Sequence, residues 1–315
     1  MNLPVAFLKL IRFPNLLFIA ATQVLFYYCV IIPFSEAIPG ALMRMEPAVF
    51  WTLVGASVLI AAGGYIINDY FDLNIDRVNR PEKMVVEKMI KRRWAIVWHL
   101  VFSFAGLLIS FYVGYRLGNP FIVLLNLAVV VLLWVYSTTF KKQLLIGNII
   151  ISLLTAWVVL ILYTCEMRFD VSRLSPSQVE YLSSVFKASV LYGGFAFIIS
   201  LVREVVKDIE DMEGDARYHC RTMPIVWGIP VSRAFAYTWM IVLGGAVLIL
   251  AVYTIQINWW WMAVYLFAAV LLPLFQVYRK LGKSTSPMDF AMVSRLLKWV
   301  MLTGILSMIF YKIYL

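Results

Sequence analysis

Residues 68–76 read Asn-Asp-Tyr-Phe-Asp-Leu-Asn-Ile-Asp and follow directly on a long apolar run. On a helix, Asp69, Asp72 and Asp76 fall at positions i, i+3 and i+7, so they share one face. Asn68 lies one turn before Asp72, at the edge of that face. Like charges at this spacing repel one another and destabilise a helix. The arrangement therefore predicts a bound cation.

A second stretch repeats this spacing later in the chain. Asp208 follows Asp69 by 139 positions, and Asp211 and Asp215 have the same offset from their counterparts. Each stretch ends an apolar span, so the repeat predicts an internal duplication of a four-helix unit. The alternative interpretation is that both stretches are solvated helix ends. A helix C-terminus favours cations, however, because its dipole is negative there.

The composition is that of an integral membrane protein. The 315 residues are 63% hydrophobic and 14% charged, whereas soluble domains carry about 25% charge. The net charge of +10 fits basic loops facing anionic lipid headgroups and does not predict nucleic-acid binding. Three scattered cysteines and two histidines exclude a disulfide framework and a histidine-rich metal site. We expect one domain, residues 1–315, folded as a single bundle.

Hydropathy sets the fold class. Nine apolar runs are long enough to cross a bilayer, and open sheets cannot satisfy their backbone in lipid. We therefore predict an all-α membrane protein with nine transmembrane helices, near 15–34, 48–68, 94–115, 119–138, 146–164, 185–205, 233–254, 258–279 and 293–314. Most of the 27 lysines and arginines then lie on one side, which the positive-inside rule assigns to the cytoplasm.

The same topology places both acidic stretches on the cytoplasmic side, of the inner membrane if the protein is bacterial. The long outer loop, near 165–184, is predicted to form a short surface helix or cap.

Two facing carboxylate clusters suit a hard cation. Mg²⁺ takes oxygen ligands and is usually completed by substrate phosphates, so the pair is suited to hold a diphosphate through bridging Mg²⁺. Nearby bases fit the same ligand: Arg77 and Arg80 follow the first stretch, and Lys207 lies beside the second. Lys141 follows two hydroxyl side chains at a membrane boundary. Each base also has a simpler interpretation as a positive-inside anchor.

Several segments resemble the UbiA superfamily of intramembrane prenyltransferases. Residues 68–81, NDYFDLNIDRVNRP, are similar to its first aspartate-rich motif, NDxxDxxxDxxxRP, and residues 208–215, DIEDMEGD, to its second, DxxDxxxD. Residues 136–148, YSTTFKKQLLIGN, resemble the Tyr-Ser…Lys…Gly-Asn signature between them. Residues 12–15, Arg-Phe-Pro-Asn, resemble the N-terminal Arg-x-Pro-Asn. After Pro81 the family pattern lapses, because the proline and glycine usual there are absent.

The resemblance implies Mg²⁺-dependent transfer of a polyprenyl group from its diphosphate to an acceptor within the membrane. By position, it implies these metal ligands: Asn68, Asp72, Asp76, Asp208, Asp211 and Asp215. It assigns catalytic roles to Asp72, Asp211 and Lys141. It places further side chains at or near the diphosphate: Arg12, Asn15, Arg77, Tyr136, Ser137 and Lys207. The expected partners are a prenyl diphosphate donor, a hydrophobic or amphipathic acceptor and the lipid bilayer, without nucleic acid.

The acceptor is a separate question. The first motif is most similar to the branch of the superfamily that prenylates geranylgeranylglyceryl phosphate. An aromatic quinone precursor, hydroxybenzoate or dihydroxynaphthoate, is the alternative. A cation-coupled transporter is the alternative from a different class, since intramembrane acids also pair at repeat interfaces in transporters.

Overall fold

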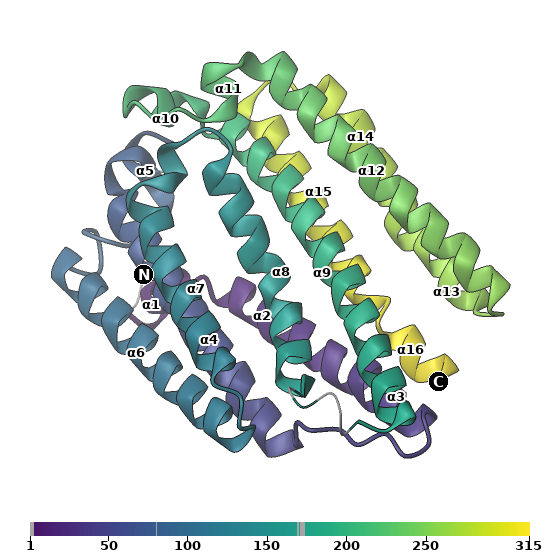
Figure 1. Cartoon of the computed structure of the whole chain (residues 1–315). Coiled ribbons are helices and arrows are strands. Elements are labelled where there is room, and N and C mark those ends of the chain that lie inside the picture. The colour runs from purple at the N-terminus through teal and green to yellow at the C-terminus, as the bar shows by residue number, and fades with distance from the viewer. Residues whose placement is uncertain (1–2, 80, 169, 171–173) are drawn as a thin grey trace.

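The computed structural model describes residues 3–79, 81–168, 170 and 174–315, which form a helical bundle (Figure 1). In this part of the chain, nine helical segments are long and apolar enough to cross a membrane. They are Phe13–Ala37, Pro47–Phe71, Arg92–Arg116, Phe121–Thr138, Ile146–Glu166, Pro176–Glu210, Gly228–Gln256, Trp260–Lys283 and Pro287–Tyr314. Each overlaps one predicted span, so the predicted all-α membrane fold is confirmed.

Most spans are single long helices. These are α4 (Pro47–Phe71), α6 (Arg92–Arg116), α7 (Phe121–Thr138), α8 (Ile146–Glu166), α9 (Pro176–Glu210) and α12 (Gly228–Gln256). The other spans are composite: α2 (Phe13–Phe26) with α3 (Ile32–Ala37), α13 (Trp260–Tyr265) with α14 (Leu272–Lys283), and α15 (Pro287–Leu306) with α16 (Ile309–Tyr314). The first two contain a π-helical segment just before a proline, where a backbone N–H is missing from the helical ladder.

Four short helices lie at the end of the bundle that carries the acidic stretches. These helices are α1 (Leu3–Leu10), α5 (Leu73–Asn79), α10 (Met212–Arg217) and α11 (Met223–Val226). Figure 1 shows α5 and α10 at the end of the bundle opposite α3 and α16. Below them, α2, α8, α9 and α15 pack against one another. The site is therefore built where long helices end, above the bundle interior.

Both long helices that carry an acidic stretch break at its middle aspartate. The first, α4, ends at Phe71 and α5 begins at Leu73; α9 ends at Glu210 and α10 begins at Met212. The three aspartates of each stretch therefore do not lie on one unbroken helix, although the Asp76 N–H still donates to the Asp72 carbonyl oxygen at 2.8 Å and the Asp215 N–H to that of Asp211 at 3.2 Å. The break agrees with the cost of stacking carboxylates at the negative end of a helix. The two breaks keep the same offset as the aspartates, while duplication of a whole four-helix unit stays a prediction.

The sixth span is longer than predicted. We expected it near 185–205, after a surface helix or cap, but α9 already begins at Pro176. Ser175 caps it by accepting a hydrogen bond from the Gln178 N–H at 3.2 Å. A proline in the first turn and a serine before it are a favourable helix start, so the residues expected to form a separate cap extend the span instead.

Candidate active site

The side chain of Asn79, the last residue of α5, joins the two acidic stretches. Its Nδ2 donates to the carbonyl oxygen of Asp211 at 3.0 Å, and its Oδ1 accepts from the Gly214 N–H at 2.8 Å. Gly214 is required for this approach, because a Cβ there would lie 2.4 Å from the Asn79 Oδ1. One amide therefore fixes the position of the second stretch relative to the first.

Asp72 is the buried centre of the first stretch, with 4% of its surface exposed. It accepts a hydrogen bond from Asn68 Nδ2 at 2.7 Å and forms an ion pair with Lys141. Burial lowers the pKa of Lys141, but Asp72, Tyr136 and Asp76 together raise it by more, so the net shift is upward and the ammonium is retained. A permanent cation therefore lies beside the carboxylate.

Arg12 reaches the same stretch from the start of α2. Its guanidinium pairs with Asp69 at 2.6 Å and lies over the Tyr65 ring, 5.2 Å from the centroid. Arg12 has a φ of 50°, a left-handed conformation that turns the chain from α1 into α2. Asn15 Oδ1 accepts a hydrogen bond from Lys298 at 3.3 Å. The ion pair with Arg12 holds Asp69 in place, which agrees with the absence of Asp69 from the metal ligands implied by the resemblance.

The connection between α7 and α8 presents Lys141 through close backbone packing. Lys141 lies in a 3₁₀ turn, Phe140–Lys142. Gly147, in the first turn of α8, allows the helix to approach this turn, since a Cβ there would lie 2.9 Å from the Phe140 carbonyl oxygen. One residue further on, Asn148 Nδ2 donates to Asp208 at 2.7 Å. This loop therefore supplies Lys141 to the first stretch and an amide to the second.

The second stretch has its own charge partners. Glu204, one turn before Asp208 on α9, is buried and pairs with Arg203 at 2.9 Å and with Lys207 at 2.8 Å. Asp215 is buried on α10, with 6% of its surface exposed. The Asp208, Asp215 and Asp72 carboxylates thus lie at one end of the bundle with Lys141 among them.

Burial and neighbouring charge raise the pKa of two of the aspartates. Burial raises the pKa of Asp76 to about 6, and the Asp72 carboxylate adds to the shift. Burial also raises the pKa of Asp215 to about 6; Lys141 opposes this shift, while Asp211 and Asp72 reinforce it. Because Asp215 responds to Asp72 and Lys141, the two stretches form one electrostatic site. A divalent cation would relieve this crowding.

Comparison with known proteins decides the family. The model of the UbiA prenyltransferase family matches residues 37–302. The chain belongs to the UbiA prenyltransferase family. This confirms the resemblance predicted from the motifs, and it removes the ground for the transporter alternative.

Individual UbiA relatives agree with this assignment. The digeranylgeranylglyceryl phosphate synthase of Methanothermobacter thermautotrophicus is 34% identical over 191 residues, which are 60% of this chain and 60% of that protein. A solved structure described as digeranylgeranylglyceryl phosphate synthase in membranes has a TM-score of 0.62 at 23% identity, and the match covers 98% of this chain and 99% of that one. A UbiA homologue from Archaeoglobus fulgidus, solved with DMAPP and Mg²⁺, has a TM-score of 0.55 at 15% identity over 96% of this chain and 98% of that one. Both solved structures share the fold of this chain.

Some residues assigned from the UbiA resemblance have other partners here. Arg77 is exposed and pairs with Glu87. The Ser137 hydroxyl donates to the Leu133 carbonyl oxygen at 2.8 Å, within its own helix. Tyr136 is half-buried, and Arg80 lies outside the described residues. The diphosphate roles of Arg77, Tyr136 and Ser137 remain predictions.

The UbiA resemblance also implies Mg²⁺, and the donors present fit that ion in one particular way. Within the described ranges, no three Asp, Glu, His or Cys side chains gather into a complete metal site. Asp215 is nevertheless a buried oxygen donor and Asp76 a half-buried one, and both have raised pKa values. Mg²⁺ commonly binds one or two carboxylates and takes its remaining ligands from water and substrate phosphates. The donor set therefore suits a metal shared with a diphosphate.

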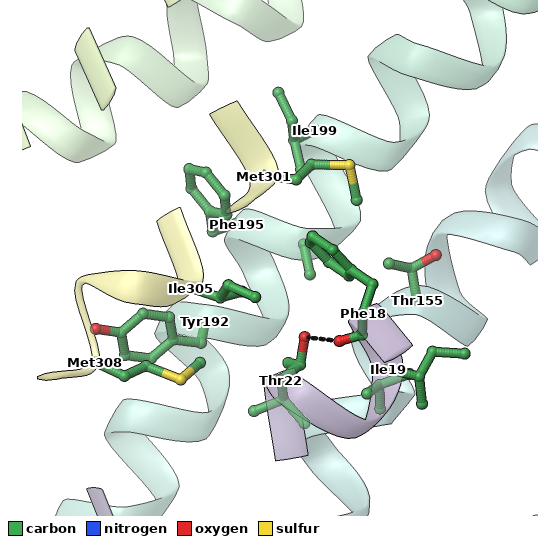
Figure 2. Close-up of a pocket in the computed structure, with 13 residues that line it drawn as sticks. Phe18, Ile19, Thr22, Thr155, Tyr192, Phe195, Ile199, Met301, Ile305 and Met308 are labelled. Carbon is green, nitrogen blue, oxygen red and sulfur yellow. Dashed lines mark hydrogen bonds between the residues drawn. The ribbon is translucent and has the colours of Figure 1, made fainter. Parts of the chain in front are cut away.

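An apolar cavity lies deeper in the bundle (Figure 2). Its lining comes from four helices and the turn after α15: Phe18, Ile19, Thr22, Thr155, Val158, Val159, Tyr192, Phe195, Ala196, Ile199, Met301, Ile305 and Met308. Ile199 precedes Asp208 by nine residues on α9, which is about 14 Å along a helix. The cavity is therefore within the span, below the charged end.

The few polar groups in this wall are already bonded elsewhere. The Thr22 hydroxyl donates to the Phe18 carbonyl oxygen at 2.8 Å, as Figure 2 shows, and the Thr155 hydroxyl donates to Ile151 at 2.8 Å. The Tyr192 hydroxyl is bonded to Ser307 at 3.0 Å. Since these groups are paired, the lining favours hydrocarbon over water.

Asn79, Asn148 and Glu204 are the site residues that we did not assign from the sequence. Asn148 belongs to the Gly-Asn end of the loop signature, so its motif was visible without its partner. Asn79 lies inside the first motif at a position that the motif leaves open. Only the paired glycine, Gly214, could have pointed to a close backbone contact there.

Proposed function

We propose that this protein is a Mg²⁺-dependent prenyltransferase that transfers a polyprenyl group from its diphosphate to geranylgeranylglyceryl phosphate within the membrane. The observation that carries the proposal is the joining of two acidic stretches by Asn79, with Lys141 paired to Asp72. This brings carboxylates and a permanent cation to the end of an apolar bundle. Membership of the UbiA family and the name of the related synthase support it.

We propose that the diphosphate binds at the charged end. Mg²⁺ held there by Asn68, Asp72, Asp76, Asp208, Asp211 and Asp215 would neutralise charge that develops on the leaving group. Lys141 donates to a diphosphate oxygen, and Arg12 keeps Asp69 in position through their ion pair. Lys207, paired with Glu204, completes the basic side of the site.

We propose that the prenyl chain extends along the apolar cavity of Figure 2. The bond between the allylic carbon and its diphosphate oxygen breaks, and the acceptor hydroxyl oxygen bonds to that carbon. The hydroxyl proton passes to the departing diphosphate. An allylic cation would be quenched by water, so a lining without free polar groups protects it.

The acceptor assignment has one competitor, an aromatic quinone precursor. Purified protein in nanodiscs, given labelled geranylgeranyl diphosphate and Mg²⁺, should be offered geranylgeranylglyceryl phosphate, hydroxybenzoate and dihydroxynaphthoate in parallel. We expect an ether-linked product with the first acceptor. Product with an aromatic acceptor alone would replace the lipid assignment, and no prenyl product with any acceptor would count against transferase activity.

The side of the membrane is also part of the proposal. The bias of basic residues assigns the charged end to the cytoplasmic side. A cysteine introduced at the exposed Glu213 should react with a membrane-impermeant thiol reagent in inside-out vesicles and stay unlabelled in right-side-out ones. The reverse pattern would invert the topology.

A further inference from the structure

A second cavity, of about 370 Å³, lies between α9 and α15. Its lining residues are Arg203, Lys207, Glu210, Ala291, Ser294, Arg295 and Lys298. Unlike the cavity of Figure 2, it is lined mainly by charged groups. We call it the α9–α15 cavity.

The charges of the α9–α15 cavity are not balanced. Two of its four cations, Arg203 and Lys207, share Glu204. Within the described residues, Arg295 and Lys298 form no ion pair. Arg295 donates to the Ala291 carbonyl oxygen at 3.4 Å, and Lys298 to the Asn15 amide oxygen at 3.3 Å. Four cations against the two carboxylates of Glu204 and Glu210 leave an excess of two positive charges.

One donor in this wall also lacks a partner. The Nε of Arg203 is buried and makes no hydrogen bond to any described residue. A buried donor left unpaired is destabilising, so a ligand oxygen at this point would be favourable. Excess positive charge and an unpaired guanidinium nitrogen together favour an anionic oxygen ligand.

The α9–α15 cavity lies next to the proposed diphosphate site, and none of the aspartates assigned to the metal lines it. Lys207 immediately precedes Asp208 on α9. On the other wall, Lys298 bonds Asn15, which lies three residues after Arg12, the partner of Asp69. An anion here would therefore lie beside the reacting centre, separate from the carboxylates assigned to the metal.

We infer that the α9–α15 cavity binds the phosphomonoester of the acceptor, an inference that rests on the proposed function. A phosphomonoester carries a charge of about −1.5 to −2 at neutral pH, which matches the excess positive charge. In a glyceryl phosphate with one prenyl ether, the remaining hydroxyl is at most two carbons from the phosphoester. A phosphate held beside Lys207 thus brings that hydroxyl close to the donor.

Arg295 and Lys298 are the residues with which to test this, because neither pairs with a described acidic residue or belongs to an acidic stretch. The double variant Arg295→Gln/Lys298→Gln removes both charges and keeps a polar side chain at each position. Lys283→Gln, at the end of α14, is the matched control: it removes an exposed cation outside the cavity. Each protein should be measured in neutral nanodiscs and in nanodiscs that contain anionic phospholipid.

We expect the double variant to raise the KM for geranylgeranylglyceryl phosphate at least about tenfold, corresponding to about 1.4 kcal/mol of binding, while the KM for the donor changes less than about twofold. Lys283→Gln should alter neither. Glycerol phosphate should raise the Tm of the wild type more than that of the double variant. This last measurement requires no turnover.

Three results would overturn the inference. An equal rise in both KM values would assign these cations to the diphosphate. A defect that appears only in anionic nanodiscs would assign them to phospholipid headgroups. Equal stabilisation of both proteins by glycerol phosphate would show that the phosphate does not bind through Arg295 and Lys298. A wild type that prenylates only aromatic acceptors, yet is stabilised by glycerol phosphate through Arg295 and Lys298, would contradict the proposed function instead.

Discussion

The side-chain amide oxygen of Asn79 accepts a hydrogen bond from the Gly214 N–H at 2.8 Å, and this bond connects the end of α5 to α10. This contact joins residues 135 positions apart and lies at the junction of the two acidic stretches. It makes the geometry of the site dependent on a side chain that is not itself assigned as a ligand.

Asn79→Ala should therefore weaken Mg²⁺ use as well as stability. The variant loses two hydrogen bonds, each worth about 0.5–1.5 kcal/mol, and leaves the second stretch untethered. We expect a lower Tm and a higher Mg²⁺ concentration for half-maximal rate. Asn74→Ala, an exposed change on the same helix, should show neither effect. A lower Tm with unchanged Mg²⁺ dependence would restrict Asn79 to a structural role.

Asp72→Ala and Asp211→Ala should each lower kcat by about 100-fold or more, because each removes a proposed ligand of the Mg²⁺ that would stabilise the leaving diphosphate. The proteins should still elute as folded monodisperse species. Glu213→Ala, at an exposed position within the second stretch, should retain turnover. Near-normal rates in both aspartate variants would refute a site built from both stretches.

Lys141→Met should also lose activity if, as we propose, the ammonium paired with Asp72 stabilises the leaving diphosphate. The neighbouring Lys142 is exposed, so Lys142→Met is a matched control. Release of labelled diphosphate is the measurement. Equal effects of the two substitutions would mean that general loop charge matters, and not the contact with Asp72.

Stabilisation by Mg²⁺ should depend on pH. The pKa values of Asp76 and Asp215 are raised to about 6, so without metal these groups favour the folded state at low pH. That contribution is lost as pH rises through about 6. Metal binding competes with the protons, and the Tm gain from Mg²⁺ should therefore be larger at pH 7.5 than at pH 5. A Tm gain that does not change with pH would show that Mg²⁺ does not bind these two carboxylates.

Filling the apolar cavity should shorten the accepted prenyl chain. Ala196→Phe adds a ring to the lining shown in Figure 2 and should reduce the rate with geranylgeranyl diphosphate far more than with dimethylallyl diphosphate. Val190→Phe, on the exposed face of the same helix, is the control. A uniform loss with both donors would indicate that the chain binds elsewhere.

The sequence allowed the spans and the acidic stretches to be predicted, because hydropathy and spacing are local properties. Asp72, Asp211 and Lys141 could be singled out in the same way. The ion-pair partners of the basic side chains could not be predicted from the sequence. Arg77 pairs with Glu87 and Lys207 with Glu204, choices that depend on which loop folds over which. The break at Asp72 was also missed, because the spacing of the aspartates predicts a helix that continues through them.

The same breaks have a consequence for the order of binding. Both α4 and α9 end at the site, so each directs the negative end of its dipole, about half an elementary charge, toward the aspartates. A bare diphosphate approaching this end meets repulsion from the backbone as well as from the side chains. The donor is therefore expected to enter as its metal complex, and a chelator should abolish donor binding itself, before any bond is broken.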